Sequence, residues 1–160
     1  MRWNQPAEYM FNILTLGELS VATLARVHSV VQPLVGACGA FELNLEKFSG
    51  LPNMIQPRFA VLHFSGEGVE AAAAISRHLD TATQQLLPHR DARPFQPNMV
   101  LGRIKTESEQ LRVALGRALK MTEHPPLGTW RIDNLELLIS HATSDGMGYK
   151  VVETLPLRQM

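Results

Sequence analysis

Residues 41–48, FELNLEKF, alternate strictly between apolar and polar side chains, and this alternation is the feature that most constrains the fold. Successive side chains of a β-strand point to opposite faces, so such a segment buries one face and exposes the other. Strands of this kind are typical of antiparallel sheets that are covered on one side. The apolar positions are Phe41, Leu43 and Leu45, and the polar positions are Glu42, Asn44 and Glu46.

The rest of the chain switches between strand-like and helix-like patterns. Strands are expected over 9–15, 41–48, 58–64, 98–104, 130–140 and 148–157, the last two joined into a hairpin by a Ser-Asp-Gly turn. Between them, three segments repeat apolar residues at helical spacing. Their expected inward faces are Leu24, Val27, Val31, Leu34 and Val35, with Pro33 bending the helix end; Ile75, Leu79, Ala82 and Leu86; and Leu111, Ala114, Leu115, Ala118 and Leu119. The order β-α-β-β-α-β-α-β-β predicts an α+β protein with largely antiparallel sheets.

Composition excludes several classes of protein. The 160 residues carry 15 basic and 15 acidic side chains, so the formal net charge is zero and wholesale attraction to nucleic acid or membrane is not indicated. No apolar run is long enough to span a bilayer, and the N-terminus lacks the layout of a secretion signal. The single cysteine, Cys38, excludes an internal disulfide and a thiolate zinc cage, which fits a reducing cytoplasm.

The remaining residues of chemical interest do not form a recognisable site. His28 and His78 lie on expected helices without a partner at metal-ligand spacing, and His63 lies on an expected strand, where a satisfied sheet histidine is the commoner role. The Gly66-Glu67-Gly68 run opens a helix but lacks the lysine of a phosphate-binding loop. We therefore expect no metal and no cofactor.

Two segments carry a family resemblance. Residues 2–19, RWNQPAEYMFNILTLGEL, and residues 93–105, RPFQPNMVLGRIK, resemble the two motif regions of the LigT-like RNA 2′,3′-cyclic phosphodiesterases, also called 2′-5′ RNA ligases, in the 2H phosphoesterase superfamily. The family patterns run roughly RWxxPENLHxTLxFLGEL and RPFxPHxTLxRxK. Residues 135–157 resemble its closing hairpin, and Pro57-Arg58-Phe59 resembles the strand that opens its second half. The resemblance implies a bilobal α+β fold, with two antiparallel sheets flanking a central cleft and helices outside.

The family's chemistry depends on one His-x-Thr motif in each region. On a strand, residues two apart share a face, so each histidine and its threonine address one phosphate together. One histidine takes a proton from the attacking water and the other gives one to the departing ribose oxygen. In this chain the motif positions hold Met10-Phe11-Asn12 and Asn98-Met99-Val100, and neither region has a histidine there. The resemblance therefore predicts a degenerate relative, not an active enzyme of this family.

What remains at these positions suggests binding without turnover. Asn12 and Asn98 have amides that donate hydrogen bonds, and Arg103 stands at the family's basic position after the second motif. Arg58 would add charge, and Tyr149 takes the place of the family's hairpin tyrosine. Our main hypothesis is that Asn12, Asn98, Arg103, Arg58 and Tyr149 bind a phosphate-bearing ligand, an RNA or a nucleotide, in the cleft. The motif positions Met10, Asn12, Asn98 and Val100 are then not catalytic.

Two alternatives stay open at this point. One is an active cyclic phosphodiesterase with a remodelled acid–base pair, for which His63 and His89 are the available donors. The other is a structural or interaction subunit whose cleft binds nothing.

The start of the chain departs from the family, whose members have a strand and a helix before the RW segment. We expect a single LigT-like domain over residues 1–160 that is shortened at its N-terminus. A vacated sheet edge would need cover, so a homodimer through the shortened lobe is expected. We do not expect the protein to bind a membrane.

Overall fold

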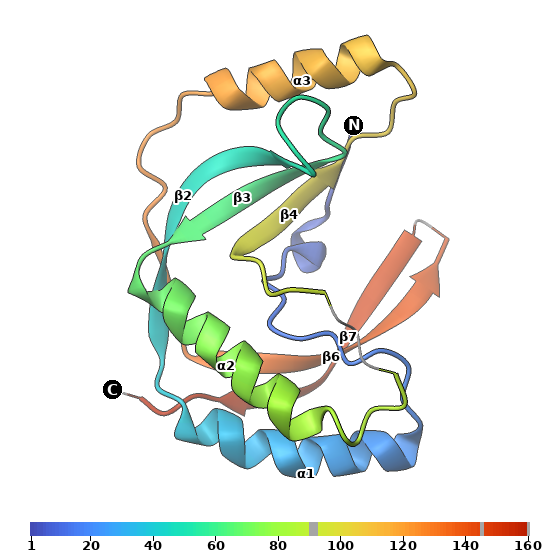
Figure 1. Ribbon diagram of the computed structural model, residues 1–160, viewed down its shortest axis with the longest axis vertical. Coiled ribbons are helices and arrows are strands. Elements are labelled where there is room, and N and C mark those ends of the chain that lie inside the picture. Colours follow the sequence, from blue (N-terminus) through green and yellow to red (C-terminus); the bar gives the residue numbers. More distant parts are fainter. Residues whose placement is uncertain (90–92, 145, 160) are drawn as a thin grey trace. The chain divides into compact units, whose positions relative to one another are not determined.

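The computed structural model describes residues 1–89, 93–144 and 146–159 (Figure 1). The strands are β1 (Arg2–Trp3), β2 (Phe41–Leu51), β3 (Phe59–Ser65), β4 (Asn98–Arg103), β5 (Thr129–Ile132), β6 (Asn134–Thr143) and β7 (Gly146–Pro156). The helices are α1 (Val21–Ala37), α2 (Glu67–Thr83) and α3 (Glu109–Met121), with a short 3₁₀ turn at Pro6–Glu8. The predicted α+β class with antiparallel strand pairs is confirmed.

The chain divides into two compact units. The first comprises Met1–Phe11, Leu43–Gly66 and Pro97–Trp130, and the second comprises Asn12–Glu42, Glu67–Gln96 and Arg131–Met160. No helix in the described segments combines the length and the apolar character needed to cross a membrane.

The larger sheet has the strand order β1-β4-β3-β2-β5. Two bulges interrupt its ladders: β2 has one extra residue between Leu45 and Lys47, and β4 has one between Val100 and Gly102. The predicted alternation in β2 is confirmed at its start, where Phe41 and Leu43 are buried and Glu42 is exposed. A bulge shifts the faces by one residue, so the alternation in β2 ends there.

Helices α1 and α2 pack side by side in the second unit, next to the β6–β7 hairpin (Figure 1). Ser20 caps α1, its hydroxyl oxygen accepting a hydrogen bond from the Thr23 amide at 3.1 Å. Val27 and Val35 are fully buried, as predicted, and Pro33 lies inside the helix, which continues to Ala37. Cys38 follows as the C-cap residue, and its thiol donates to the Leu34 carbonyl oxygen at 3.2 Å.

The predicted inward face of α3 is partly wrong. Leu115 and Leu119 are half-buried as expected, but Leu111 is 56% exposed, and Ala114 and Ala118 are also exposed. The one buried residue of this helix is Gly116, which lies against the Met54 carbonyl and the Pro57 ring. Because glycine has no side chain, it lets the helix backbone approach the loop between β2 and β3, and this close approach sets which face turns inward (Figure 1).

Two strand predictions also need correction. Residues 9–15 form no strand: the Asn12 amide donates to the Thr15 hydroxyl at 2.9 Å, and the Ile13 carbonyl accepts from the Ser76 hydroxyl of α2 at 2.7 Å. The polar groups of this segment thus find partners outside a sheet ladder. The segment predicted as one strand over 130–140 is divided at Asp133 into β5 and β6, which belong to different sheets.

The hairpin prediction is confirmed, since β6 and β7 form a two-stranded antiparallel sheet. Of the predicted Ser-Asp-Gly turn, Asp145 lies outside the described residues.

Candidate ligand-binding site

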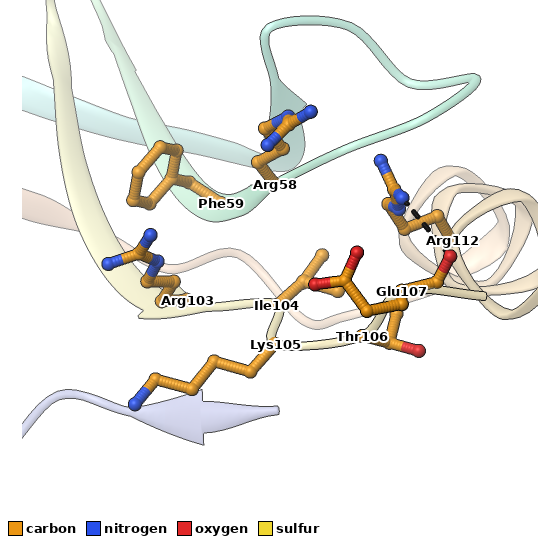
Figure 2. A pocket seen from close by; sticks show the side chains of 8 residues that line it. All are labelled: Arg58, Phe59, Arg103, Ile104, Lys105, Thr106, Glu107 and Arg112. Atoms are coloured by element: carbon orange, nitrogen blue, oxygen red, sulfur yellow. Dashed lines mark hydrogen bonds between the residues drawn. The ribbon is translucent and has the colours of Figure 1, made fainter. Parts of the chain in front are cut away.

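A pocket of about 550 Å³ opens in the first unit, where β3 begins and β4 ends (Figure 2). Four cationic side chains line it, together with the ring of Phe59 and the carboxylate of Glu107. The four cations are Arg58, Arg103, Lys105 and Arg112.

Backbone hydrogen bonds hold the pocket's two strand ends together. The Arg58 amide donates to the Leu51 carbonyl at 2.6 Å, and the Ile104 amide donates to the Arg58 carbonyl at 2.8 Å. These bonds fix Arg58 beside Ile104, which lies between Arg103 and Lys105 in the chain. The side chain of Ile104 is 6% exposed, so it anchors this turn of the chain in the core while its two basic neighbours stay in solvent.

Helix α3 supplies the fourth cation. Ser108 caps the helix by accepting a hydrogen bond from the Leu111 amide at 3.3 Å. Arg112 lies one turn further on, and its guanidinium donates to the Glu107 carbonyl oxygen at 3.4 Å. The cap therefore determines where Arg112 enters the pocket.

The pocket has an uncompensated positive charge. Within the described part of the chain, none of Arg58, Arg103 and Lys105 forms an ion pair, and neither does Arg112. The guanidinium of Arg103 instead lies 6.0 Å from the centre of the Phe59 ring. The Nε atom of Arg112 is buried and has no hydrogen-bond partner among these residues. Because its four cations have no ion-pair partners in the described chain, the pocket is chemically suited to an anion with several acceptor oxygens.

The second motif region lies on β4, and its register defines two faces. Asn98 is directly opposite His63 on β3, and His63 is directly opposite Lys47 on β2. Directly opposed residues of an antiparallel pair share a face, with Cβ atoms about 5 Å apart. Lys47, His63 and Asn98 therefore form a row across three strands, and neither the Lys47 nor the His63 side chain has a hydrogen bond or an ion pair to any described residue.

The register also shows that the two motif positions on β4 lie on one face of the sheet and the residue between them on the other. Val100 is opposite Val61, on the face of the row, whereas Met99 is opposite Leu62, on the other face. Asn98 and Val100 thus share a face and Met99 does not, as the strand prediction required. Arg103 lies roughly 16 Å further along β4 from Asn98, opposite Phe59.

The predicted ligand-binding residues fall into separate groups. Arg58 and Arg103 line one pocket, and Asn98 lies at the other end of β4. Asn12 and Tyr149 belong to the second unit, where Asn12 is exposed and Tyr149 is 43% exposed on β7, opposite Ser140. Met10 is half-buried in an irregular segment of the first unit.

Sequence reasoning missed two features of the site. Arg112 is not among the residues predicted from the sequence, and only its position one turn after the Ser108 cap signals that it turns toward the β4 end. The pairing of His63 with Asn98 depends on strand register, for which the sequence carries no direct signal. Among the described residues, no three His, Cys, Asp or Glu side chains gather in a way that could hold a metal ion.

Comparison with known proteins gives a clear result for the fold. No family model matches the sequence, and neither does any curated protein. Among solved structures, the chain is similar to TT0787 of Thermus thermophilus, with a TM-score of 0.75 and 22% identity, over 99% of this chain and 82% of that one. It is similar to E. coli LigT complexed with 3′-AMP, with a TM-score of 0.75 and 16% identity over 99% and 82% of the two chains. E. coli LigT complexed with phosphate gives a TM-score of 0.70 and 15% identity over 99% and 80%. The chain therefore has the LigT-like fold of the 2H phosphoesterases.

Proposed function

We propose that this protein is a relative of the LigT-like 2H phosphoesterases that binds a phosphate-bearing or nucleotide ligand without the family's acid–base chemistry. The observation that carries the proposal is the pocket with four cations, none of which has an ion-pair partner in the described chain. Guanidinium groups present several donors in a fixed plane and match the oxygens of phosphate well. E. coli LigT has been solved with phosphate and with 3′-AMP, which supports the same class of ligand here.

The residues at the motif positions support binding over turnover. Methionine cannot transfer protons, and the asparagine amide does not titrate in the useful range. Each positioned acid or base typically contributes about 10²–10⁴ in rate, so the loss of both histidines removes most of the family's catalysis. We propose that the cations of this pocket, Arg58 and Arg103 among them, hold the ligand's phosphate groups. Ligand binding by Asn98, Asn12 and Tyr149, which do not line this pocket, stays a separate proposal.

Binding of inorganic phosphate tests this proposal. The amide NMR signals of residues 103–107 are expected to shift on titration into the millimolar range. Arg103→Gln should weaken the affinity about tenfold, because a charge-assisted hydrogen bond is lost. Arg117→Gln, which removes an equal charge from an exposed position of α3 outside this pocket, serves as the control and should leave the affinity within about twofold. Unchanged signals at these residues would contradict the proposal.

A second candidate function is favoured by the row of Lys47, His63 and Asn98. His63 lies on the strand next to the missing motif histidine and on the same face, so its imidazole is a possible replacement acid or base. Lys47, on its other side, would attract the phosphate toward it. On this hypothesis the protein is a cyclic phosphodiesterase with a remodelled acid–base group.

Hydrolysis of a short RNA ending in a 2′,3′-cyclic phosphate separates the two candidates. With wild-type protein in excess we expect no turnover above the rate in buffer. Turnover that survives purification, falls at least tenfold in His63→Gln and persists in His124→Gln would instead establish the remodelled enzyme. Asn98→Ala, measured in parallel, reports whether the motif position takes part.

Three further expectations stay proposals: residence in the cytoplasm, organisation as a single domain, and association as a homodimer through the shortened N-terminal lobe. Exposed apolar side chains on the β6–β7 hairpin, a different surface, also favour association, because a two-stranded sheet alone is marginally stable in water. They are Ile139, Met147, Tyr149, Val151 and Val152.

A further inference from the structure

The charge of the pocket exceeds what a single phosphate neutralises. Four cations against the one carboxylate of Glu107 leave an excess of three positive charges (four minus one). A phosphate monoester carries about −1.5 to −2 at neutral pH, so one such group leaves part of the cluster uncompensated. Two linked phosphates carry roughly twice that charge and match the cluster better.

The pocket is also larger than a single phosphate group requires. Its volume of about 550 Å³ lies in the range of sites for whole small molecules, about 300–1,000 Å³. In Figure 2, Arg103 and Lys105 extend to the left from the end of β4, whereas Arg58 lies at the top and Arg112 at the right. The cations are thus spread over the pocket and do not converge on one point.

Arg112 supplies an independent indication of a second acceptor. One of its terminal nitrogens donates to the Glu107 carbonyl, and the other has no hydrogen-bond partner in the described chain. This second terminal nitrogen is not buried, unlike Nε, so it can donate to a bound oxyanion.

From the charge, the spread of the cations and the unused terminal nitrogen of Arg112, we infer that the pocket takes a ligand with two linked phosphate groups, a pyrophosphate or a pyrophosphate-bearing compound. One phosphate is held by Arg103 and Lys105, and the other by Arg58 and Arg112. This inference rests on the proposed binding of phosphate and narrows it to one chemical class.

The test compares inorganic pyrophosphate with inorganic phosphate by isothermal titration calorimetry at fixed ionic strength, without divalent metal. Pyrophosphate should bind about tenfold more tightly, because two further cations are engaged and each is worth about two- to fivefold. Arg112→Gln should weaken pyrophosphate binding several-fold more than it weakens phosphate binding, which removes most of this preference. Arg117→Gln, on the same helix and outside the pocket, removes the same charge and should keep the preference.

The outcomes separate this inference from the function on which it rests. Phosphate binding without a preference for pyrophosphate would overturn the inference and leave the proposed function standing. No binding of either anion, with NMR signals unchanged, would overturn both. Citrate binding as tightly as pyrophosphate would show a response to charge alone and would also overturn the inference. If Arg112→Gln does not fold, judged by circular dichroism, Arg58→Gln tests the same half of the pocket.

Discussion

Asn98→His combined with Val100→Thr is expected to raise hydrolysis of a 2′,3′-cyclic phosphate about a hundredfold above the wild-type rate, the lower end of the range for one positioned acid or base. Both positions lie on the same face of β4, so the new imidazole and hydroxyl would together address the cyclic phosphate of an RNA bound at this end of β4, and not in the pocket at its other end. The measurement is single-turnover cleavage of a short RNA with a cyclic phosphate end, with protein in excess.

Strand geometry provides the control for this experiment. Met99→His places an imidazole on the opposite face of β4, beside Leu62, and should give no gain in rate. An equal gain in the two variants would mean that the face carrying Asn98 is not the one that meets the ligand. No gain in either variant, with circular dichroism unchanged, would contradict the idea that β4 retains the family's phosphate-facing positions.

Gly116→Ala is expected to lower the free energy of unfolding by about 2 kcal/mol or more, the cost of forcing an extra methyl group into a packed contact. An added Cβ at Gly116 would collide with the Met54 carbonyl, and backbone on both sides leaves no flexible side chain to move away. Helix α3 would have to shift from the loop between β2 and β3, which also disturbs Arg112 and the pocket. Urea denaturation followed by circular dichroism gives the change.

The matched control is Gly36→Ala in α1, where an added Cβ meets nothing within 4 Å. This variant should be neutral or more stable by up to about 1 kcal/mol, because alanine has the better helix propensity. If both variants behave alike, close packing at Gly116 does not hold α3 in place.

The sequence predicted those parts of the fold that depend on local pattern. Alternation in residues 41–48 predicted β2, helical spacing of Val27, Val31 and Val35 predicted the buried face of α1, and the hairpin at the C-terminal end was expected from its turn residues. The two motif regions pointed to the LigT-like fold that the structural comparisons show. These features were accessible because each is set by neighbours within a few residues along the chain.

Other features of the fold could not be predicted from local sequence patterns. The apolar spacing in α3 suggested Leu111 as an inward residue, yet the close contact of Gly116 with Met54 turns a different face inward. Residues 9–15 have the composition of a strand, but their polar groups are satisfied by Thr15 and by Ser76 of α2. In both cases a contact between distant segments overrode local preference.

The sequence by itself determined the order of the three helices, of β2 to β4 and of the closing hairpin, the resemblance in the two motif regions and the absence of histidine at Met10 and Asn98. Only the tertiary structure decided which charges act together. It gathers Arg58, Arg103, Lys105 and Arg112 around one pocket and sets His63 beside Asn98. The physical reason is that strand register and helix packing join residues far apart in the chain, and these are fixed by the burial of the whole core and not by any local sequence signal.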